Sequence, residues 1–110
     1  MIPSSVSEVF MLAHNVYFTL KDQSPEAKQA LLAACREHLS GHPGEVFFAC
    51  GTREEALGRA VNDKDFDVAL IVVFETIAAH DAYQVAPRHK QFIAECQPNW
   101  GTVRVFDASC

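Results

Sequence analysis

Apolar and polar side chains alternate along the first part of the chain. Between residues 10 and 20 the even-numbered positions are apolar except for His14, whereas Asn15, Tyr17 and Thr19 occupy odd-numbered positions. Side chains of a β-strand point alternately to the two faces of a sheet, so this period of two predicts a long strand with one apolar face. His14 lies on that apolar face, where an unpaired imidazole is costly.

The most hydrophobic segment of the chain is Phe66–Glu75, with the sequence FDVALIVVFE. Its positions are apolar on both faces, which is typical of a strand that is buried on both sides. The helices of so short a chain can cover only one face of a sheet. We therefore expect a second subunit to cover the other face of this strand.

Helix signals lie between the strand patterns. Ser24 followed by Pro25 is a typical helix start, because the serine side chain caps a free N–H group and proline fits the first turn. Thr76 predicts a second helix start, and Pro87 is expected to break that helix and restart it, with His89 in the first turn of the new piece. The other expected elements are strands at residues 45–51 and 101–107 and a polar connection with one helical turn at residues 52–65.

The expected order of elements is strand, helix, strand, strand, helix, strand. This is the split βαβ arrangement of a ferredoxin-like α+β domain, with a four-stranded antiparallel sheet and helices on one face. A length of 110 residues allows one core. We expect a single domain over residues 9–110, preceded by a polar arm over residues 1–8.

Composition and charge exclude several classes of partner. The nine lysine and arginine residues are scattered singly in a chain of net charge -5, so there is no basic stripe for nucleic acid. The first residues have neither a basic region nor a long apolar run, so no secretory signal or membrane span is expected and the protein is predicted to be cytoplasmic. The four cysteines form no closely spaced pair, and the sequence predicts neither a cofactor nor a metal site.

Four segments of the sequence resemble one known family: HNVYFTLKD, GHPGEVFFACG, FDVALIVVFE and AYQVAPRHKQF. In this order they are similar to the stress-responsive A/B barrel, or Dabb, domain, and the resemblance extends from His14 to Asp107. It implies a homodimer in which two four-stranded sheets pack face to face as a dimeric α+β barrel. Members include plant stress-associated proteins, a plant polyketide cyclase and bacterial proteins of unassigned role, so the resemblance implies the fold more firmly than an activity.

The cyclase members of the family imply roles for three residues of this chain. The resemblance places His89 as a base, Tyr83 as the group that assists it, and His14 in the wall of the pocket. Ala86 departs from the family, which often has a histidine before the proline of this segment. A polar side chain of the family's pocket is therefore absent here.

His89 also has a physical basis for acting as a base. The positive end of the helix dipole in the first turn favours a neutral imidazole. Beside Tyr83, a neutral imidazole can remove a proton from a carbon acid or bind a carbonyl group. The alternative is a purely structural role, in which His89 holds the broken helix against the first strand.

His14 has two interpretations. It either pairs with a buried group in the region of His89 or lines a cavity that water or a ligand fills. The remaining histidines, His38, His42 and His80, fall on expected helix surfaces or loops. Solvation is the simplest prediction for these three side chains.

The sequence leaves several functions open. The leading hypothesis is a homodimer that binds a small apolar or aromatic molecule between the sheet and the helices, in a cavity lined by His14, Phe18, Phe48, Phe74 and Phe92. The second is an enzyme of the polyketide cyclase, lyase or isomerase type with His89 as general base and Tyr83 as hydrogen-bond donor. The third is a ligand-free structural dimer. A cofactor-free monooxygenase of the same barrel type is a further alternative, which Asn15 and Trp100 keep open.

Overall fold

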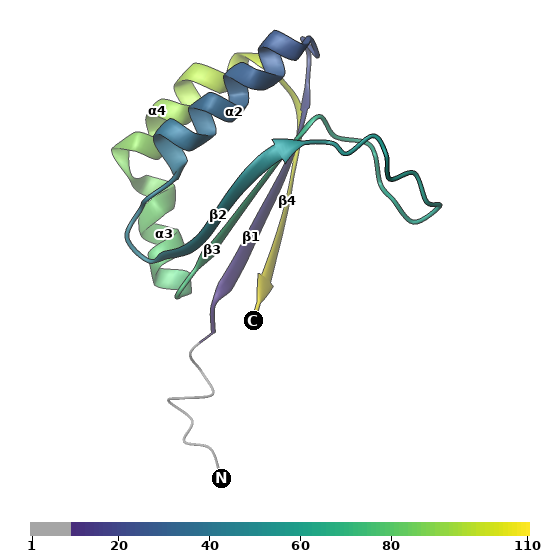
Figure 1. The fold of residues 1–110 in the computed structure, drawn as a ribbon. Coiled ribbons are helices and arrows are strands. Elements are labelled where there is room, and N and C mark those ends of the chain that lie inside the picture. Colours follow the sequence, from purple (N-terminus) through teal and green to yellow (C-terminus); the bar gives the residue numbers. More distant parts are fainter. Residues whose placement is uncertain (1–9) are drawn as a thin grey trace.

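The computed structural model describes residues 10–110 and folds them into one four-stranded sheet with helices on one face (Figure 1). The strands are β1 (Leu12–Leu20), β2 (Glu45–Thr52), β3 (Val68–Phe74) and β4 (Trp100–Ser109). They lie in the order β2, β3, β1, β4, and each neighbouring pair is antiparallel. The ferredoxin-like fold is therefore confirmed, whereas the predicted N-terminal arm lies outside the described residues.

Strand β1 lies inside the sheet, because it pairs with β3 on one side and with β4 on the other. Burial alternates along the whole of β1, and its even-numbered side chains are the buried ones, as the sequence pattern predicts. His14 lies opposite Val72 of β3 and Asp107 of β4. Directly opposite residues of antiparallel strands share a face, so these three side chains lie on the side of the sheet that carries the helices.

Side-chain caps define where two of the helices begin. The helices are α2 (Pro25–Leu39), α3 (Ile77–Val85) and α4 (Pro87–Cys96), followed by a short 3-10 turn, η1 (Gln97–Asn99). The Ser24 hydroxyl accepts the Ala27 N–H at 3.2 Å, and the Thr76 hydroxyl accepts the Ala79 N–H at 3.1 Å. Each cap satisfies one N–H group that has no partner within its helix, and both predicted helix starts are confirmed.

The break between α3 and α4 falls at Ala86, whose backbone is extended with φ -65° and ψ 145°. The ring of Pro87 disfavours a helical conformation at the preceding residue, which explains why the helix stops there and restarts at the proline. The predicted break is confirmed. It makes His89 the third residue of α4, so its side chain lies in the first helical turn.

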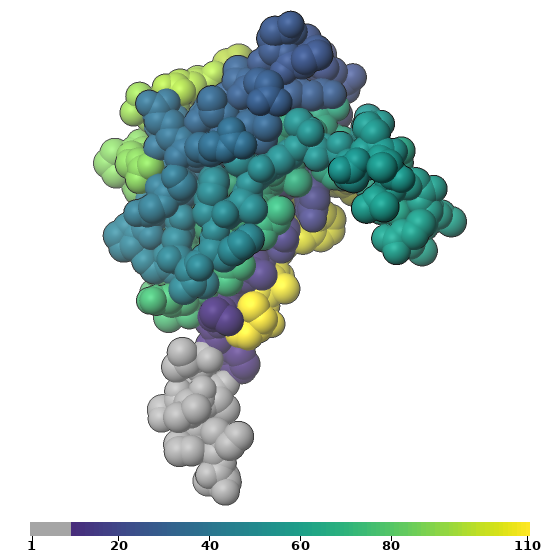
Figure 2. All heavy atoms as spheres, viewed as in Figure 1, coloured from purple at the N-terminus to yellow at the C-terminus, as the bar shows by residue number. Residues whose placement is uncertain are grey.

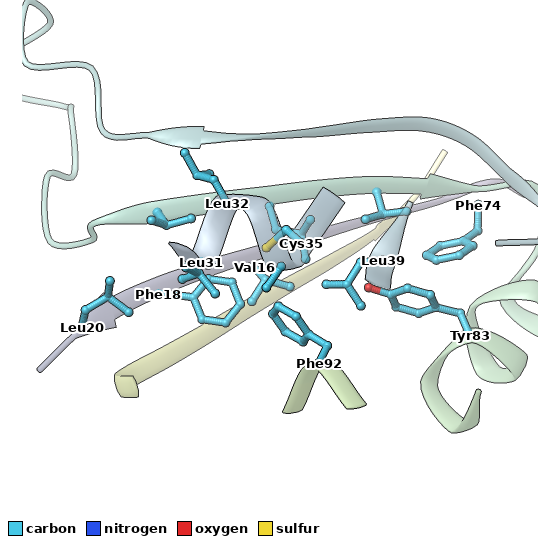
Figure 3. Packing of buried hydrophobic residues seen from close by; sticks show 14 of the residues in the cluster. Val16, Phe18, Leu20, Leu31, Leu32, Cys35, Leu39, Phe74, Tyr83 and Phe92 are labelled. Carbon is cyan, nitrogen blue, oxygen red and sulfur yellow. The ribbon is translucent and has the colours of Figure 1, made fainter. Parts of the chain in front are cut away.

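The hydrophobic core lies between the sheet and the helices (Figure 3). Phe74 of β3 and both Cys35 and Leu39 of α2 have no exposed surface. Phe92 of α4 is 3% exposed and faces Phe18 of β1, with their ring centres 6.3 Å apart. Both α2 and α4 are therefore held against β1 and β3 by one continuous apolar cluster.

The opposite face of the sheet carries no helix of the described chain (Figure 1). Ala69, Ile71 and Val73 of β3 point to this face and are half-buried. Phe47 of β2 and Phe106 of β4 are 55% and 54% exposed. Strand β3 therefore presents apolar side chains to both faces of the sheet, and residues 10–110 leave its second face open.

The segment between β2 and β3 projects from the sheet as a long loop (Figures 1 and 2). The expected helical turn is wrong, because residues 53–67 form turns and extended chain but no helix. Arg53 holds the base of the loop by donating to the backbone oxygens of Lys64 (2.7 Å) and Phe66 (3.2 Å). On the open face of the sheet, a hollow of about 560 Å³ is lined by Asn15, Tyr17, Asp63, Phe66, Arg104 and Phe106.

Candidate functional site

Four of the five histidines of the chain surround one tyrosine, Tyr83. The distances from the centre of the Tyr83 ring are 4.7 Å to His89, 5.0 Å to His42, 6.2 Å to His14 and 6.4 Å to His80. These side chains come from β1, the α2–β2 loop, α3 and α4. We call this group the Tyr83 site. The fold brings together the three residues of the predicted site, His14, Tyr83 and His89, and adds two histidines to them.

Tyr83 projects from α3 into the core and is 2% exposed. Figure 3 shows its hydroxyl directed toward Leu39 rather than toward solvent. Among the described residues this buried hydroxyl has no hydrogen-bond partner. Burial raises the pKa of the phenol above its ordinary value, so the hydroxyl keeps its proton and is a hydrogen-bond donor.

His89 of α4 is 9% exposed, and its Nδ1 atom is buried without a hydrogen-bond partner among the described residues. Burial lowers the pKa of His89 below its ordinary value, and the imidazoles of His14, His42 and His80 lower it further. Both causes favour the neutral ring, as the position in the first helical turn also does. Tyr83 and His89 therefore place a proton donor and a neutral imidazole side by side, in edge-to-face contact.

His14 is paired with a carboxylate that the sequence did not point to. Its Nδ1 atom lies 2.6 Å from Oδ1 of Asp107 on β4, and His14 itself is 5% exposed. Of the two interpretations of His14, the structure shows the paired one, with Asp107 as the partner because the β1–β4 register places it directly opposite. This pair holds the His14 ring against the Tyr83 site.

The prediction that His38, His42 and His80 are solvated is wrong. His38 is 5% exposed and its Nε2 lies 3.0 Å from Oε2 of Glu95, because α2 packs against α4. His42 is 7% exposed and donates from Nε2 to the backbone oxygen of His38 at 2.6 Å. The His80 side chain is 16% exposed. The sequence could have indicated that His80 belongs to the Tyr83 site. His80 and Tyr83 are three residues apart in α3, and residues with this spacing share a helix face.

A cavity of about 200 Å³ lies beside Tyr83, and its walls are His42, Pro43, Ala82, Tyr83 and Ala86. Two of these walls are alanines, whose small side chains leave the space open. One of them is Ala86, the position where the family resemblance leads one to expect a larger polar residue. The departure at Ala86 therefore widens the space next to the Tyr83 ring.

The four phenylalanines predicted to line a ligand pocket lie in or against the core. Phe74 contacts Tyr83 with ring centres 4.9 Å apart, and Phe92 approaches His89 at 6.4 Å. Phe18 is buried behind Phe92, and Phe48 is a partly buried residue packed against the same cluster. Phe74 and Phe92 thus support the Tyr83 site from the core side.

Two groups of side chains within residues 10–110 have ligand atoms close enough to hold a metal ion: His14, His80 and Asp107, and Glu37, His38 and Glu95. In each group the atoms lie within 4.8 Å of one another. The first group includes two histidines of the Tyr83 site. The second lies where α2 meets α4, and its two glutamates are more exposed.

The sheet order, the helices on one face and the buried polar site define a ferredoxin-like α+β domain. The chain belongs to the stress responsive A/B barrel domain (Dabb) family, whose sequence profile matches residues 12–110. No curated protein sequence matches it. Within the described residues, no helix is long and apolar enough to cross a membrane.

Solved structures share this fold. A Dabb family protein with a ferredoxin-like fold from Mesorhizobium loti is 23% identical, with a TM-score of 0.75, and the match covers 90% of this chain and 95% of that chain. A dimeric ferredoxin-like protein of unknown function from Thermobifida fusca is 19% identical, with a TM-score of 0.76 and coverage of 94% and 93%. The hydroxynitrile lyase of Passiflora edulis is 22% identical, with a TM-score of 0.73 and coverage of 91% and 93%. At these identities the likeness shows the fold alone.

Proposed function

We propose that the protein is a homodimer that binds a small apolar or aromatic molecule carrying an oxygen acceptor, at the Tyr83 site between the sheet and the helices. The observation that carries this proposal is the pair of buried polar atoms, the Tyr83 hydroxyl and His89 Nδ1, which lack hydrogen-bond partners among the described residues. Leaving a buried polar group unpaired costs about 1–3 kcal/mol. A bound molecule that reaches either atom from the neighbouring cavity, whose wall includes Tyr83 but not His89, offsets part of this cost.

The shape of the site supports a small ligand. The cavity of about 200 Å³ lies below the roughly 300–1,000 Å³ of sites for drug-sized molecules. Pro43, Ala82 and Ala86 give it apolar walls, while Tyr83 and His42 give it an aromatic and a polar wall. This combination suits an aromatic or branched aliphatic body with one carbonyl or hydroxyl oxygen.

The open face of the sheet supports the homodimer. Ile71 and Val73 of β3 and the exposed rings of Phe47 and Phe106 form an apolar surface there. Apolar surface of this kind is stabilised when another surface removes it from water. A second copy of the same sheet offers a matching apolar face, and the Thermobifida fusca protein of similar fold is described as dimeric.

Replacing Tyr83 by phenylalanine tests the ligand site. The variant loses only the hydroxyl, so we expect the fold to be retained and binding to weaken about tenfold or more, as loss of one buried hydrogen bond implies. The measurement is a thermal-shift screen of phenols, apolar acids and polyketide mimics, followed by calorimetry on the compounds that bind. Tyr17→Phe is the matched control, because Tyr17 lines the hollow on the open face.

The two variants separate the two hollows of the molecule. Weakened binding in Tyr83→Phe with unchanged binding in Tyr17→Phe supports the Tyr83 site. The reverse pattern would place the ligand on the open sheet face and contradict the proposal. A screen without any binding compound would favour the ligand-free structural dimer.

A second candidate function is catalysis with His89 as general base and Tyr83 as hydrogen-bond donor, in a cyclisation, isomerisation or lyase step. The neutral His89 ring beside a protonated phenol favours it, because a general base must begin the reaction unprotonated. If a bound compound is converted, His89→Gln is expected to lower turnover roughly 100-fold or more while the compound still binds. Product formation in single-turnover mixtures measures this, with His38→Gln as control. Unchanged turnover in His89→Gln would remove the assignment.

A further inference from the structure

Three potential metal ligands meet at one end of the sheet although they lie far apart in the sequence. They are His14 on β1, His80 on α3 and Asp107 on β4. One nitrogen of each imidazole and one oxygen of the carboxylate lie within 4.8 Å of one another. The two imidazole rings meet edge to face, with their centres 4.8 Å apart.

We propose that His14, His80 and Asp107 form a binding site for a divalent first-row transition metal, with Zn²⁺ as the ion that suits the donor set best. Two imidazole nitrogens and one carboxylate oxygen are typical ligands of this ion. Three protein ligands leave the fourth position of a tetrahedral ion open for water or another ligand. This inference does not depend on the small-molecule binding proposed above.

The geometry needs only small movements to hold an ion. With metal-to-ligand bonds of about 2.0–2.1 Å, tetrahedral ligand atoms lie about 3.3 Å apart. The His14 Nδ1 to Asp107 Oδ1 distance of 2.6 Å has to open slightly, and the contacts to His80 have to close. The proton that His14 Nδ1 and Asp107 Oδ1 share is released to solvent when the ion binds. Rotation of the Asp107 side chain, which is 42% exposed, can supply the first of these changes.

The side chains around His80 are of the kind that support a metal-binding imidazole. Its Nδ1 lies 3.2 Å from the carboxylate of Asp81, and its Nε2 accepts an N–H of the Gln84 amide at 3.3 Å. An Nε2 atom that accepts a hydrogen bond is unprotonated, so its electron pair can bind a metal ion once the Gln84 amide turns away. A carboxylate behind the other ring nitrogen is a common support for histidines that bind metals.

The local charge also fits a divalent cation. Asp107 and Asp81 place two carboxylates beside the His14 and His80 rings. A bound ion of charge +2 balances the two carboxylates, and the partly exposed Asp107 leaves a path from solvent to the site. Glu37, His38 and Glu95 form a weaker alternative, because they supply one imidazole and two glutamates whose side chains are 73% and 46% exposed.

Calorimetric titration of the full chain with ZnCl₂, after dialysis against EDTA, tests the site. We expect one Zn²⁺ per chain and at least tenfold weaker binding in both His80→Gln and Asp107→Asn. His38→Gln is the matched control, since it removes a buried, carboxylate-paired histidine outside the set, and it is expected to bind Zn²⁺ like the parent. Circular dichroism of each metal-free variant verifies its fold.

Two results would overturn the inference. One is the absence of stoichiometric Zn²⁺ binding to the parent protein, and the other is loss of binding in His38→Gln with retention in His80→Gln and Asp107→Asn. Co²⁺ gives a second readout that does not depend on stability, because its visible absorption is strong only in a four-coordinate site. Tyr83→Phe is expected to keep the Co²⁺ spectrum, so failure of the small-molecule site and failure of the metal site are distinguishable.

Discussion

Replacing Ile71 by glutamate is expected to convert the proposed homodimer to a monomer. Ile71 lies in β3 on the open face of the sheet, between Asn15 of β1 and Ala49 of β2 in the strand register. In a homodimer that joins these faces, the substitution buries one carboxylate in each subunit without a partner. An uncompensated buried charge costs several kcal/mol, so the dimer dissociation constant is expected to rise about 100-fold or more. Sedimentation equilibrium over a range of concentrations measures it.

Ile77→Glu is the matched control for Ile71→Glu. Ile77 is 54% exposed at the start of α3, on the side of the sheet that carries the helices. A glutamate in the first helical turn faces the positive end of the helix dipole, so this variant is expected to fold and dimerise like the parent. A dimer that survives Ile71→Glu but dissociates in Ile77→Glu would place the contact between subunits on the helices and contradict the sheet-to-sheet arrangement.

Replacing Phe74 by alanine is expected to lower the free energy of unfolding by about 3–5 kcal/mol. Phe74 has no exposed surface and contacts Tyr83, His80 and His14, at ring-centre distances of 4.9, 5.6 and 6.5 Å. The missing ring removes apolar burial and leaves a cavity that the rigid surroundings fill only in part. Since domains of this size have a total stability of about 5–15 kcal/mol, the variant is expected to be marginally folded. Urea denaturation at one fixed protein concentration measures the change.

Phe10→Ala is the control for the loss of a phenylalanine as such. Phe10 precedes β1 and is 49% exposed, so its replacement is expected to change stability by no more than about 0.5 kcal/mol. If Phe74→Ala lowers the free energy of unfolding by less than about 1 kcal/mol, close to the change in Phe10→Ala, the core and the Tyr83 site are not one packed unit.

Much of the fold follows from local patterns in the sequence. The period of two in β1 predicts a strand that is buried on one face. The apolar residues on both faces of β3 predict a strand that is covered on both faces. Ser24 and Thr76 mark helix starts because their side chains cap N–H groups of the next turn, and Pro87 marks a break because its ring clashes with a helical residue before it. The polar loop carries no such pattern, which explains why the expected helical turn in it is wrong.

The site is predictable only in part. The resemblance to the Dabb family pointed to His14, Tyr83 and His89, and the structure places all three within one cluster of rings. His42 was missed because its burial depends on the packing of a loop over α3. Asp107 was missed because an acidic residue near the end of an edge strand gives no sign of the side chain that lies opposite.

The sequence by itself determined the elements, their order and which face of each strand is apolar, because these depend on residues a few positions apart. Only the tertiary structure decided that His14 pairs with Asp107 and that four histidines surround Tyr83. Those contacts depend on the antiparallel register of β1 and β4 and on how α3 and α4 lie over the sheet. Register and helix placement result from the packing of the whole core, to which distant segments contribute together.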